Sequence, residues 1–419
     1  MIDPSPTNNL PTCYPELRMY RLAFSLLLLT PLQLFAQQPE LRWWKGNLHT
    51  HSLWSDGDEF PEMIADWYRQ RGYNFLALTD HNVLSEGMRW MSLKSIVSRS
   101  DDKILDRYKE RFGEAWVESR MNEGDQQIRL KPLSEYRALL EQNDQFILIP
   151  AEEISDRAEG KPVHINATNL AEVIQPAGGK TVREAMQNNL RAILEHEKQH
   201  GREVLPHINH PNFGYAITAA DLAAVVSEQF FEVYNGHPTV NQLGDANHPS
   251  IERMWDLANA IRRTELKVPP LMGIATDDSH EYHGKPGSRP GRGWIMVRSR
   301  YLTPERLIQA IKRGDFYASS GVVLDDVTYK KETKTLKLAI NPQPKATYST
   351  QFIATLRQAP EGSDPIGQVV ATAEGLNPEY RLTGNELYVR AVVNSSLPHN
   401  DPSFKNQVRQ AWTQPVGWE

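Results

Sequence analysis

The chain has 419 residues, of which 40% are hydrophobic and 23% are charged, a balance typical of globular proteins with an ordinary core. Its length exceeds that of one usual domain, so we expect two. The formal net charge of −6 leaves no broad cationic surface and argues against stable nucleic-acid binding, although a small basic pocket for an anion is compatible with it. Cys13 is the only cysteine, which excludes a disulfide framework and, downstream, a thiolate nucleophile or a cysteine-based zinc site.

Residues 1–36 have the pattern of a secretory signal peptide. Arg18 and Arg21 precede an apolar run at 22–35, and Ala36 follows it. The run is shorter than the roughly 20 apolar residues that a membrane span needs. We therefore predict cleavage after Ala36 and export to the periplasm or the exterior, with no membrane span in the mature chain. An uncleaved N-terminal anchor is the alternative.

From residue 43 onward, short β-rich apolar runs alternate with helical patterns. This rhythm favours a parallel sheet with crossover helices, strand and helix alternating throughout. The predicted strands are 43–48, 74–78, 146–149, 163–168, 203–208, 230–234 and 271–275. The predicted helices are 61–71, 133–142, 181–200, 251–263 and 303–313. Seven strands of this kind indicate an α/β barrel in residues 41–321.

Two segments depart from this rhythm. Residues 83–131 are charged and longer than a strand-to-helix connection needs, so we interpret them as an insertion over the mouth of the barrel. A solvated decoration without substrate contact is the alternative. Residues 322–419 show alternating strand patterns between turn signals such as Asn341-Pro342. They predict a small, all-β, sandwich-like C-terminal domain of unknown role.

Polar clusters close successive predicted strands. His49 and His51 lie two apart, so on a strand their side chains face the same side and can meet one metal ion. The pair alone is weak evidence, because any single cluster also fits a core histidine or a capping aspartate. Together the clusters predict a metal site at the mouth of a barrel. The others are Asp80-His81, Glu152-Glu153 with His164, His207 to His210, and Asp277-Asp278 with His280.

The ordered motifs His-x-His, Thr-Asp-His, Glu, His, His-Pro and Asp-x-His span roughly residues 45–285. In this order they resemble the polymerase and histidinol phosphatase (PHP) superfamily of metallophosphoesterases. The resemblance implies a distorted seven-stranded (β/α) barrel, with two or three metal ions at the C-terminal ends of its strands.

The resemblance also implies a ligand set. The first ion would be held by His49, His51, Glu153 and Asp278, with Glu153 bridging to a second ion at His164 and His210, and with a third ion at Asp56, His81 and His280. The family motifs favour Glu153 over Glu152 and Asp278 over Asp277. Glu153 and Asp278 therefore become the carboxylates closest to the chemistry.

This ligand chemistry suits hydrolysis. Imidazole and carboxylate bind zinc, manganese and iron alike, and a bridging carboxylate lets two dications sit about 3.5–4 Å apart. A metal-bridging hydroxide can then attack phosphorus in line while the ions neutralise the phosphate oxygens. We predict an enzyme for a small-molecule or oligomeric phosphoester, either a phosphomonoesterase or a phosphodiesterase. Asp80 and Asp277 are candidates to orient the ligating imidazoles.

Other polar residues are weaker candidates. We interpret His207 as a core histidine rather than a ligand. Asn235 and His237 follow a predicted strand and can face the pocket. A cation in the Gly/Pro-rich loop after His280 can bind a substrate phosphate. Its candidates are Lys285, Arg289 and, ranked first as a catalytic residue, Arg292.

Two rival functions belong to other classes. The segment from His196 through Glu197 to His200 matches the His-Glu-x-x-His pattern of zinc proteases, which would indicate a metal-dependent amidohydrolase or peptidase. No third ligand follows at the extended metzincin spacing, and the segment ends a helix that we interpret as an outer crossover. The second rival is a catalytically inactive, secreted binding protein. The convergence of nine polar residues on one mouth argues against it.

Overall fold

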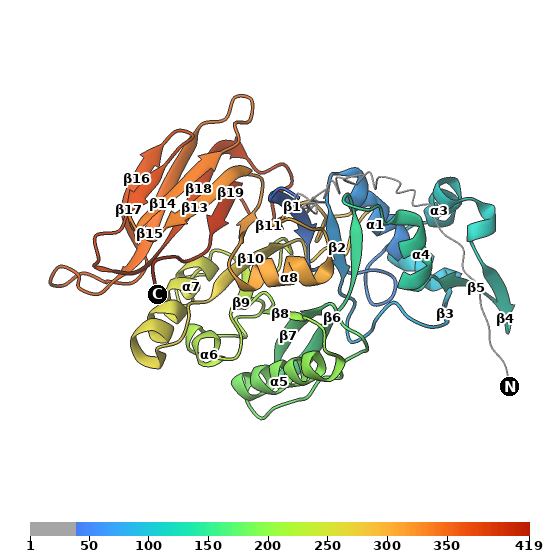
Figure 1. Cartoon of the computed structure of the whole chain (residues 1–419). Helices are drawn as coiled ribbons and strands as arrows, with labels where there is room; N and C mark the ends of the chain where they lie inside the picture. Colours follow the sequence, from blue (N-terminus) through green and yellow to red (C-terminus); the bar gives the residue numbers. More distant parts are fainter. Residues whose placement is uncertain (1–38) are drawn as a thin grey trace, which may run out of the picture. The chain divides into compact units, whose positions relative to one another are not determined.

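The computed structural model describes residues 39–419 (Figure 1). The predicted signal peptide at 1–36 lies outside the described residues, so its cleavage and the export of the chain stay predictions. Within 39–419, no helix has both the length and the apolar character that crossing a membrane requires.

Most strands belong to one mixed sheet of 13 strands, in the spatial order β10-β9-β8-β7-β6-β2-β1-β11-β12-β19-β18-β15-β16. The fold is therefore of the mixed α/β class, as predicted. The bounds of these strands are β1 (Arg42–Asn47), β2 (Phe75–Leu78), β6 (Ile147–Ala158), β7 (Lys161–Thr168), β8 (Leu205–Ile208), β9 (Phe230–Asn235), β10 (Met272–Thr276), β11 (Trp294–Ser299), β12 (Phe316–Ser319), β15 (Tyr348–Leu356), β16 (Gln368–Glu374), β18 (Glu386–Pro398) and β19 (Val408–Thr413).

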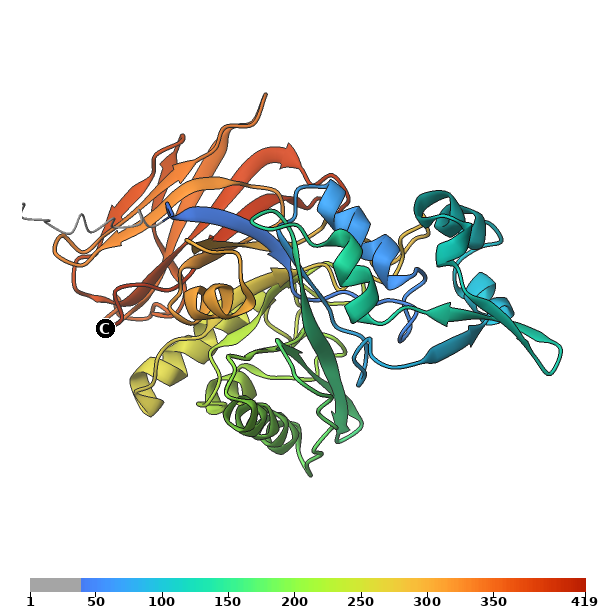
Figure 2. The same ribbon diagram turned by 45° about the vertical axis from the view of Figure 1, so that its right-hand side comes forward.

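The strands predicted in 41–321 are present as β1, β2, β6, β7, β8, β9 and β10, and they are neighbours in the sheet. Four of the pairs between them, β1–β2, β2–β6, β8–β9 and β9–β10, are parallel. The predicted alternation of strand and helix is wrong at β7, which pairs antiparallel with both β6 and β8. Only Glu159 and Gly160 connect β6 to β7, whereas a parallel crossover needs a dozen or more residues. Figure 2 shows β6 as the long green strand of this hairpin.

Backbone hydrogen bonds join the segments that follow β1 and β10. The N–H of His51 donates to the carbonyl of Ser279 at 2.9 Å, and the N–H of Asp278 donates to the carbonyl of His49 at 2.9 Å. Thr50 and Ser279 form a parallel bridge. The ends of strands far apart in the sequence therefore lie together, while the seven-stranded barrel itself stays a prediction.

The predicted helices are present as α1 (Pro61–Gln70), α4 (Leu133–Leu140), α5 (Val182–His200), α7 (Ile251–Ile261) and α8 (Pro304–Lys312), and the short α6 (Ala219–Ala224) and η2 (Arg262–Leu266) add to them. The Thr303 side chain caps α8 by accepting the N–H of Arg306, and Pro304 occupies the first position. The apolar face of α5, with Leu190 and Ile193, packs in a core that includes Ile208 of β8.

The segment 83–131 folds into elements of its own. They are β3 (Arg89–Ser92), α2 (Leu93–Arg99), α3 (Ile104–Phe112), η1 (Glu114–Trp116), β4 (Ser119–Asn122) and β5 (Asp125–Leu130), with the strands in the order β3-β5-β4. Tyr108 of α3 stacks on Phe60, with ring centroids 3.9 Å apart. The Arg99 guanidinium donates a hydrogen bond to the carbonyl of Ser55, and the backbone carbonyl of Arg99 accepts one from the Lys285 ammonium group. The segment thus contacts the loop that carries Asp56, and its position over a barrel mouth stays a prediction.

The described residues of 322–419 hold strands and no helix. Strands β13 (Leu324–Lys330), β14 (Thr335–Ile340) and β17 (Glu379–Arg381) form a three-stranded sheet. The other strands continue the large sheet, because β12 pairs antiparallel with β19. Leu336 and Leu338 of the small sheet share a core with Phe352 and Val389 of the large one. A separate sandwich-like domain that begins at 322 stays a prediction.

Candidate metal centre

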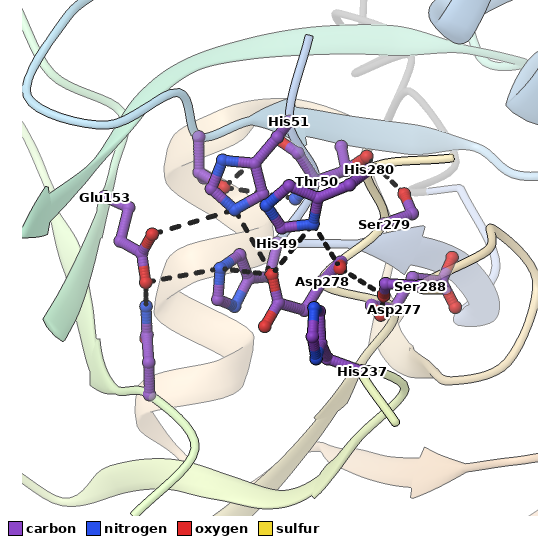
Figure 3. Close-up of polar contacts among 12 residues, drawn as sticks. His49, Thr50, His51, Glu153, His237, Asp277, Asp278, Ser279, His280 and Ser288 are labelled. Atoms are coloured by element: carbon purple, nitrogen blue, oxygen red, sulfur yellow. Dashed lines mark hydrogen bonds and ion pairs between the residues drawn. The ribbon is translucent and has the colours of Figure 1, made fainter. Parts of the chain in front are cut away.

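All nine predicted ligands lie in one cluster, seen in part in Figure 3. His49 and His51 follow β1, and His81 follows β2. Glu153 lies within β6, and the other predicted ligands come from β7 or from the segments after β1, β8 and β10: His164, Asp56, His210, Asp278 and His280. Two of them have positive φ, 24° for His210 and 48° for Asp278. Such backbone strain in non-glycine residues is concentrated at functional sites.

The first predicted group surrounds His49 and His51. The Nε2 atom of His49 lies 3.4 Å from Oε1 of Glu153 and 3.3 Å from Oδ1 of Asp278. The Nε2 atom of His51 lies 3.2 Å from the same Asp278 oxygen and 3.7 Å from Oε2 of Glu153. Both imidazoles therefore present Nε2 to the same two carboxylates.

Glu153 also faces the second predicted group. Its Oε1 atom lies 3.0 Å from Nδ1 of His164 and 3.3 Å from Nε2 of His210. Its Oε2 atom lies 2.7 Å from Nδ1 of His81. This carboxylate stands between the groups, as a bridging ligand must.

The third predicted group has a more exposed carboxylate. Asp56 lies 3.4 Å from Nε2 of His81, 3.4 Å from Nε2 of His280 and 3.7 Å from Nδ1 of His51. The Asp56 side chain is 54% exposed, whereas that of His51 is fully buried. His51 therefore belongs to two groups, which the motif order alone did not indicate.

The cluster fits divalent metal ions. Nε2 of His49, Nε2 of His51 and Oε2 of Glu153 are buried, and although other candidate ligand atoms lie close to each of them, none has a partner in hydrogen-bonding geometry within the described part of the chain. Unpaired buried polar atoms are costly, and these three converge with other nitrogen and oxygen donors of the kind that zinc, manganese and iron prefer. Ligand atoms lie within 4.8 Å of one another in each of several groups: His51, Asp56, His81 and His280; His49, His210 and Asp278; His49, His51 and Glu153; and His81, Glu153 and His164.

The electrostatics favour the metal-binding forms of Glu153, Asp278 and His51. In other histidines of the cluster, burial lowers the pKa but the nearby carboxylates outweigh it and raise the pKa, namely in His49, His81, His210 and His280. Burial raises the pKa of Glu153, yet the nearby imidazoles, first that of His164, hold this pKa well below its usual value. Burial likewise raises the pKa of Asp278, and His49 outweighs it and holds that pKa well below normal. Burial lowers the pKa of His51 to about 3. Ionised carboxylates and a neutral imidazole are the forms that coordinate metal ions.

Glu232, within β9, is a site residue that the sequence motifs missed. Its Oε1 atom lies 2.7 Å from Nδ1 of His49 and accepts from the Thr276 hydroxyl at 2.7 Å. Its Oε2 atom accepts from the N–H of His210 at 2.7 Å and from Nδ2 of Asn235 at 2.8 Å. With Nδ1 of His49 donating to Glu232, the Nε2 lone pair of that ring faces the cluster. A lone carboxylate inside the apolar run 230–234 was the available signal.

Asp80 and Asp277 do not orient imidazoles, which corrects their predicted role. Asp80 accepts from the N–H and hydroxyl of Ser52, at 2.8 and 2.7 Å, and from the Ser55 hydroxyl at 2.6 Å. Asp277 accepts from the Tyr68 hydroxyl at 2.6 Å and from backbone N–H groups of residues 291–293. Each carboxylate fixes a loop beside the cluster, the first being the loop that carries Asp56.

The arginine ranked first for phosphate binding lies elsewhere. Arg292 is 3% exposed, and its Nη1 donates to the carbonyls of Gly236 and Gly287 at 2.7 and 2.8 Å. Its Nε donates to Asp401 at 3.2 Å, and Arg289 also donates to Asp401. These contacts favour a structural role for Arg292 over the predicted contact with substrate.

Three further residues lie outside the cluster. Glu152 points away from it, because Oε1 accepts the N–H of Ile174 at 2.7 Å. Nε2 of His196 accepts the N–H of Ala171 at 3.0 Å, and Glu197 pairs with Lys312 at 3.0 Å. The first histidine and the glutamate of the His-Glu-x-x-His segment therefore contact other parts of the chain rather than the metal cluster. By contrast, His207 is fully buried beside the site, with Nε2 at 3.6 Å from Glu232.

A cavity of about 170 Å³ opens on the cluster. It is lined by seven of the predicted ligands and by three other residues, namely Asp56, His81, Glu153, His164, His210, Asp278 and His280 together with Phe213, His237 and Val240. Burial lowers the pKa of His237. The cavity therefore has one wall of candidate metal ligands and one wall of other side chains.

Comparisons with known proteins give structural neighbours only. No protein-family model and no curated protein sequence matches the chain. A two-domain protein from Bacteroides vulgatus that contains a predicted PHP-like metal-dependent phosphoesterase is 14% identical, over 90% of this chain and 96% of that one, with a TM-score of 0.38. A candidate metal-dependent phosphoesterase from Bifidobacterium adolescentis is 14% identical, over 59% of this chain and 91% of that one, with a TM-score of 0.29.

Proposed function

We propose that the chain is a metal-dependent phosphoesterase of the PHP type, acting on a phosphomonoester or a phosphodiester. The observation that carries this proposal is the gathering of nine motif residues in one cluster, seven of which line a cavity, with buried donor atoms that lack hydrogen-bond partners in the described part of the chain. Two or three ions of zinc, manganese or iron suit these donors. The proposal includes export, a seven-stranded barrel in 41–321 and a sandwich-like domain in 322–419.

Divalent ions at the cluster would supply Lewis-acid activation of water and neutralisation of the charge on the phosphoryl oxygens. The chain's own residues hold that arrangement in place. Glu232 fixes the tautomer of His49, and Asn235 donates to Oδ2 of Asp278 at 3.0 Å. Asp80 anchors Ser55 and, through it, the loop of Asp56. The burial of Glu153 and His49, 1% and 0% exposed, keeps bulk water from their ligand atoms.

The test is metal removal and repletion on the full chain. Treatment with a chelator should lower turnover of p-nitrophenyl phosphate or bis(p-nitrophenyl) phosphate by more than about 100-fold, and added zinc, manganese or iron should restore it. Asp278→Ala and His49→Ala should remain inactive after repletion. His200→Ala is the matched control: its histidine pairs with Glu172 at 3.2 Å on α5, so activity should be unchanged.

Three results would contradict the proposal. Turnover that survives both metal removal and the Asp278→Ala change would exclude the metal centre. Cleavage of amide substrates without cleavage of any phosphoester, combined with loss of activity in His200→Ala, would favour the peptidase alternative. Metal binding without turnover on either class would favour the inactive binding protein.

A further inference from the structure

Two loops at the cavity share the sequence pattern His-Pro-x-apolar, at His210 to Phe213 and at His237 to Val240. In each loop the N–H of the fourth residue donates to the carbonyl of the histidine, at 2.8 Å in the first and 3.1 Å in the second. Proline at the second position is favoured in such β-turns. Phe213 and Val240 then pair as an antiparallel bridge. The two turns are therefore structural counterparts, set side by side at the cavity.

The two histidines differ in what they contact. Nε2 of His210 lies 3.3 Å from Glu153, within the metal cluster. Nδ1 of His237 accepts the backbone N–H of Thr239 at 3.2 Å and lies 2.7 Å from the Thr239 hydroxyl. A backbone N–H can only donate, so Nδ1 of His237 carries no proton and the ring proton is on Nε2. No residue of 39–419 is hydrogen-bonded to this Nε2–H group.

The His237 ring is held at a fixed place beside the cluster. Its N–H donates to Oδ1 of Asn235 at 2.8 Å, and Nδ2 of the same asparagine donates to Asp278 at 3.0 Å. Gly236 allows the close approach, because a Cβ there would lie 2.6 Å from the carbonyl of Asp277. Figure 3 shows His237 next to Asp278. One asparagine thus ties this ring to a candidate metal ligand.

The rest of the wall is apolar. Phe213 and Val240 line the cavity on either side of their bridge, and the Phe213 ring centroid lies 6.5 Å from that of His237. The described lining contains no lysine and no arginine. A charged leaving group would lose its hydration against this wall and gain no partner from it.

We propose that His237 donates a hydrogen bond from Nε2 to a phosphoryl oxygen of the substrate, and that Phe213 and Val240 receive an uncharged, apolar leaving group, aryl or short alkyl. This proposal rests on the proposed function and narrows its substrate class. His237 is then a catalytic residue in the strict sense, because it touches the substrate, whereas Asn235 and Thr239 position it.

The first experiment measures phosphate binding, which needs no turnover. Inorganic phosphate is titrated calorimetrically into the manganese-loaded full chain. His237→Phe keeps a ring but removes the donor, so the dissociation constant should rise about 10-fold or more, the effect of one hydrogen bond to a charged group. His237→Gln, which keeps an N–H donor, should recover part of the loss. His248→Phe is the control, since His248 stacks on Tyr215 and bonds Asp245 outside the cavity lining.

The second experiment addresses the leaving group. Phenyl phosphate and glycerol 2-phosphate present the same phosphoryl group with an apolar and a polar leaving group. In Phe213→Ser, kcat/KM for phenyl phosphate should fall about 10-fold while that for glycerol 2-phosphate changes little, because only the aryl ring loses its apolar partner. His237→Phe should lower kcat/KM for both substrates by similar factors.

The outcomes separate this proposal from the proposed function. If the wild-type chain hydrolyses no phosphoester, the proposed function fails and this proposal fails with it. If the wild type is active but His237→Phe binds phosphate as tightly as the wild type and as His248→Phe, the donor role is overturned. Equal losses for both substrates in Phe213→Ser would overturn the apolar leaving-group assignment alone.

Discussion

At the residue scale, Glu232 makes the strongest prediction about the metal centre. It is fully buried and accepts four hydrogen bonds, two of them from His49 and from the N–H of His210. In Glu232→Gln an NH₂ group replaces one of the two carboxylate oxygens. Two hydrogen-bond donors then face each other at that position. The His49 ring then loses the partner that fixes its tautomer, so we expect metal affinity to fall about 10- to 100-fold, as measured by competition with a chelator.

Glu152→Gln is the matched control for this change. Glu152 is also a fully buried strand carboxylate, but its bond at 2.7 Å goes to the N–H of Ile174 rather than to a candidate ligand. Metal affinity should stay at the wild-type value. An equal loss in the two variants would mean that burying an amide in this sheet, rather than the contact with His49, causes the effect.

The residues of the candidate site were predictable where they stand at strand ends, and less so elsewhere. His49, His81 and Asp278 follow strands directly, so their order along the chain was visible. Asp80 is predicted to orient a ligating imidazole, yet adjacent residues of an extended chain point to opposite sides, and Asp80, next to His81, bonds Ser52 instead. The partner of Arg292 is Asp401, 109 positions away, and no local pattern reveals such a contact.

At the scale of elements, the β6–β7 hairpin carries two candidate ligands in a fixed register. Ser155 pairs with His164, two positions along β6 from Glu153, so both candidates lie on one face. The sequence patterns located both strands but not their direction. Pro150 and the polar residues after it interrupt the apolar run, so the predicted strand ended at 149 whereas β6 continues to Ala158. The short connection to β7 was therefore hidden.

Gly160 in the hairpin turn provides a test of this register. It has φ of 75°, and a Cβ added there would meet no atom within 4 Å. Gly160→Val therefore costs backbone strain alone, about 1–2 kcal/mol of unfolding free energy. Because the turn sets the pairing of β6 with β7, metal affinity should fall as well. Both are measurable, by urea unfolding of the metal-free chain and by chelator competition.

Gly72→Val separates strain from register. Gly72 has φ of 73° and equally open surroundings, but it follows α1 and lies in no hairpin. It should lose similar stability and keep wild-type metal affinity. If both variants kept their metal affinity, the hairpin turn would have no part in placing Glu153 and His164.

At the scale of the whole molecule, the C-terminal strands are joined to the part that holds the metal cluster. The side-chain amide of Gln414 exchanges two hydrogen bonds with the backbone of Gly273 in β10, at 2.8 and 2.9 Å. Asp401 accepts a hydrogen bond from Arg292, and Arg292 donates another to the carbonyl of Gly236 in the loop after β9. The loop that places His237 is thus braced by residues from both parts of the chain. We expect 39–419 to unfold as one cooperative unit.

The buried pair of Asp256 in α7 and Arg390 in β18 is the contact that tests this cooperativity. Arg390 is 1% exposed, lies over the Trp255 ring at 4.7 Å, and donates to Asp256 at 2.7 and 3.0 Å. Asp256→Asn leaves the buried guanidinium with only the partly exposed Glu252, 3.3 Å from Nη1, as countercharge, so the free energy of unfolding should fall by up to about 3–5 kcal/mol. Adding Arg390→Met removes that charge and should recover part of the loss, because apolar replacements of both partners are often tolerated. Urea unfolding followed by tryptophan fluorescence and by circular dichroism measures both effects. If the double variant were no more stable than Asp256→Asn, the buried guanidinium charge would not be the cause of the lost stability. A single coincident unfolding transition in every variant would show that the two parts of the chain stay coupled without this pair.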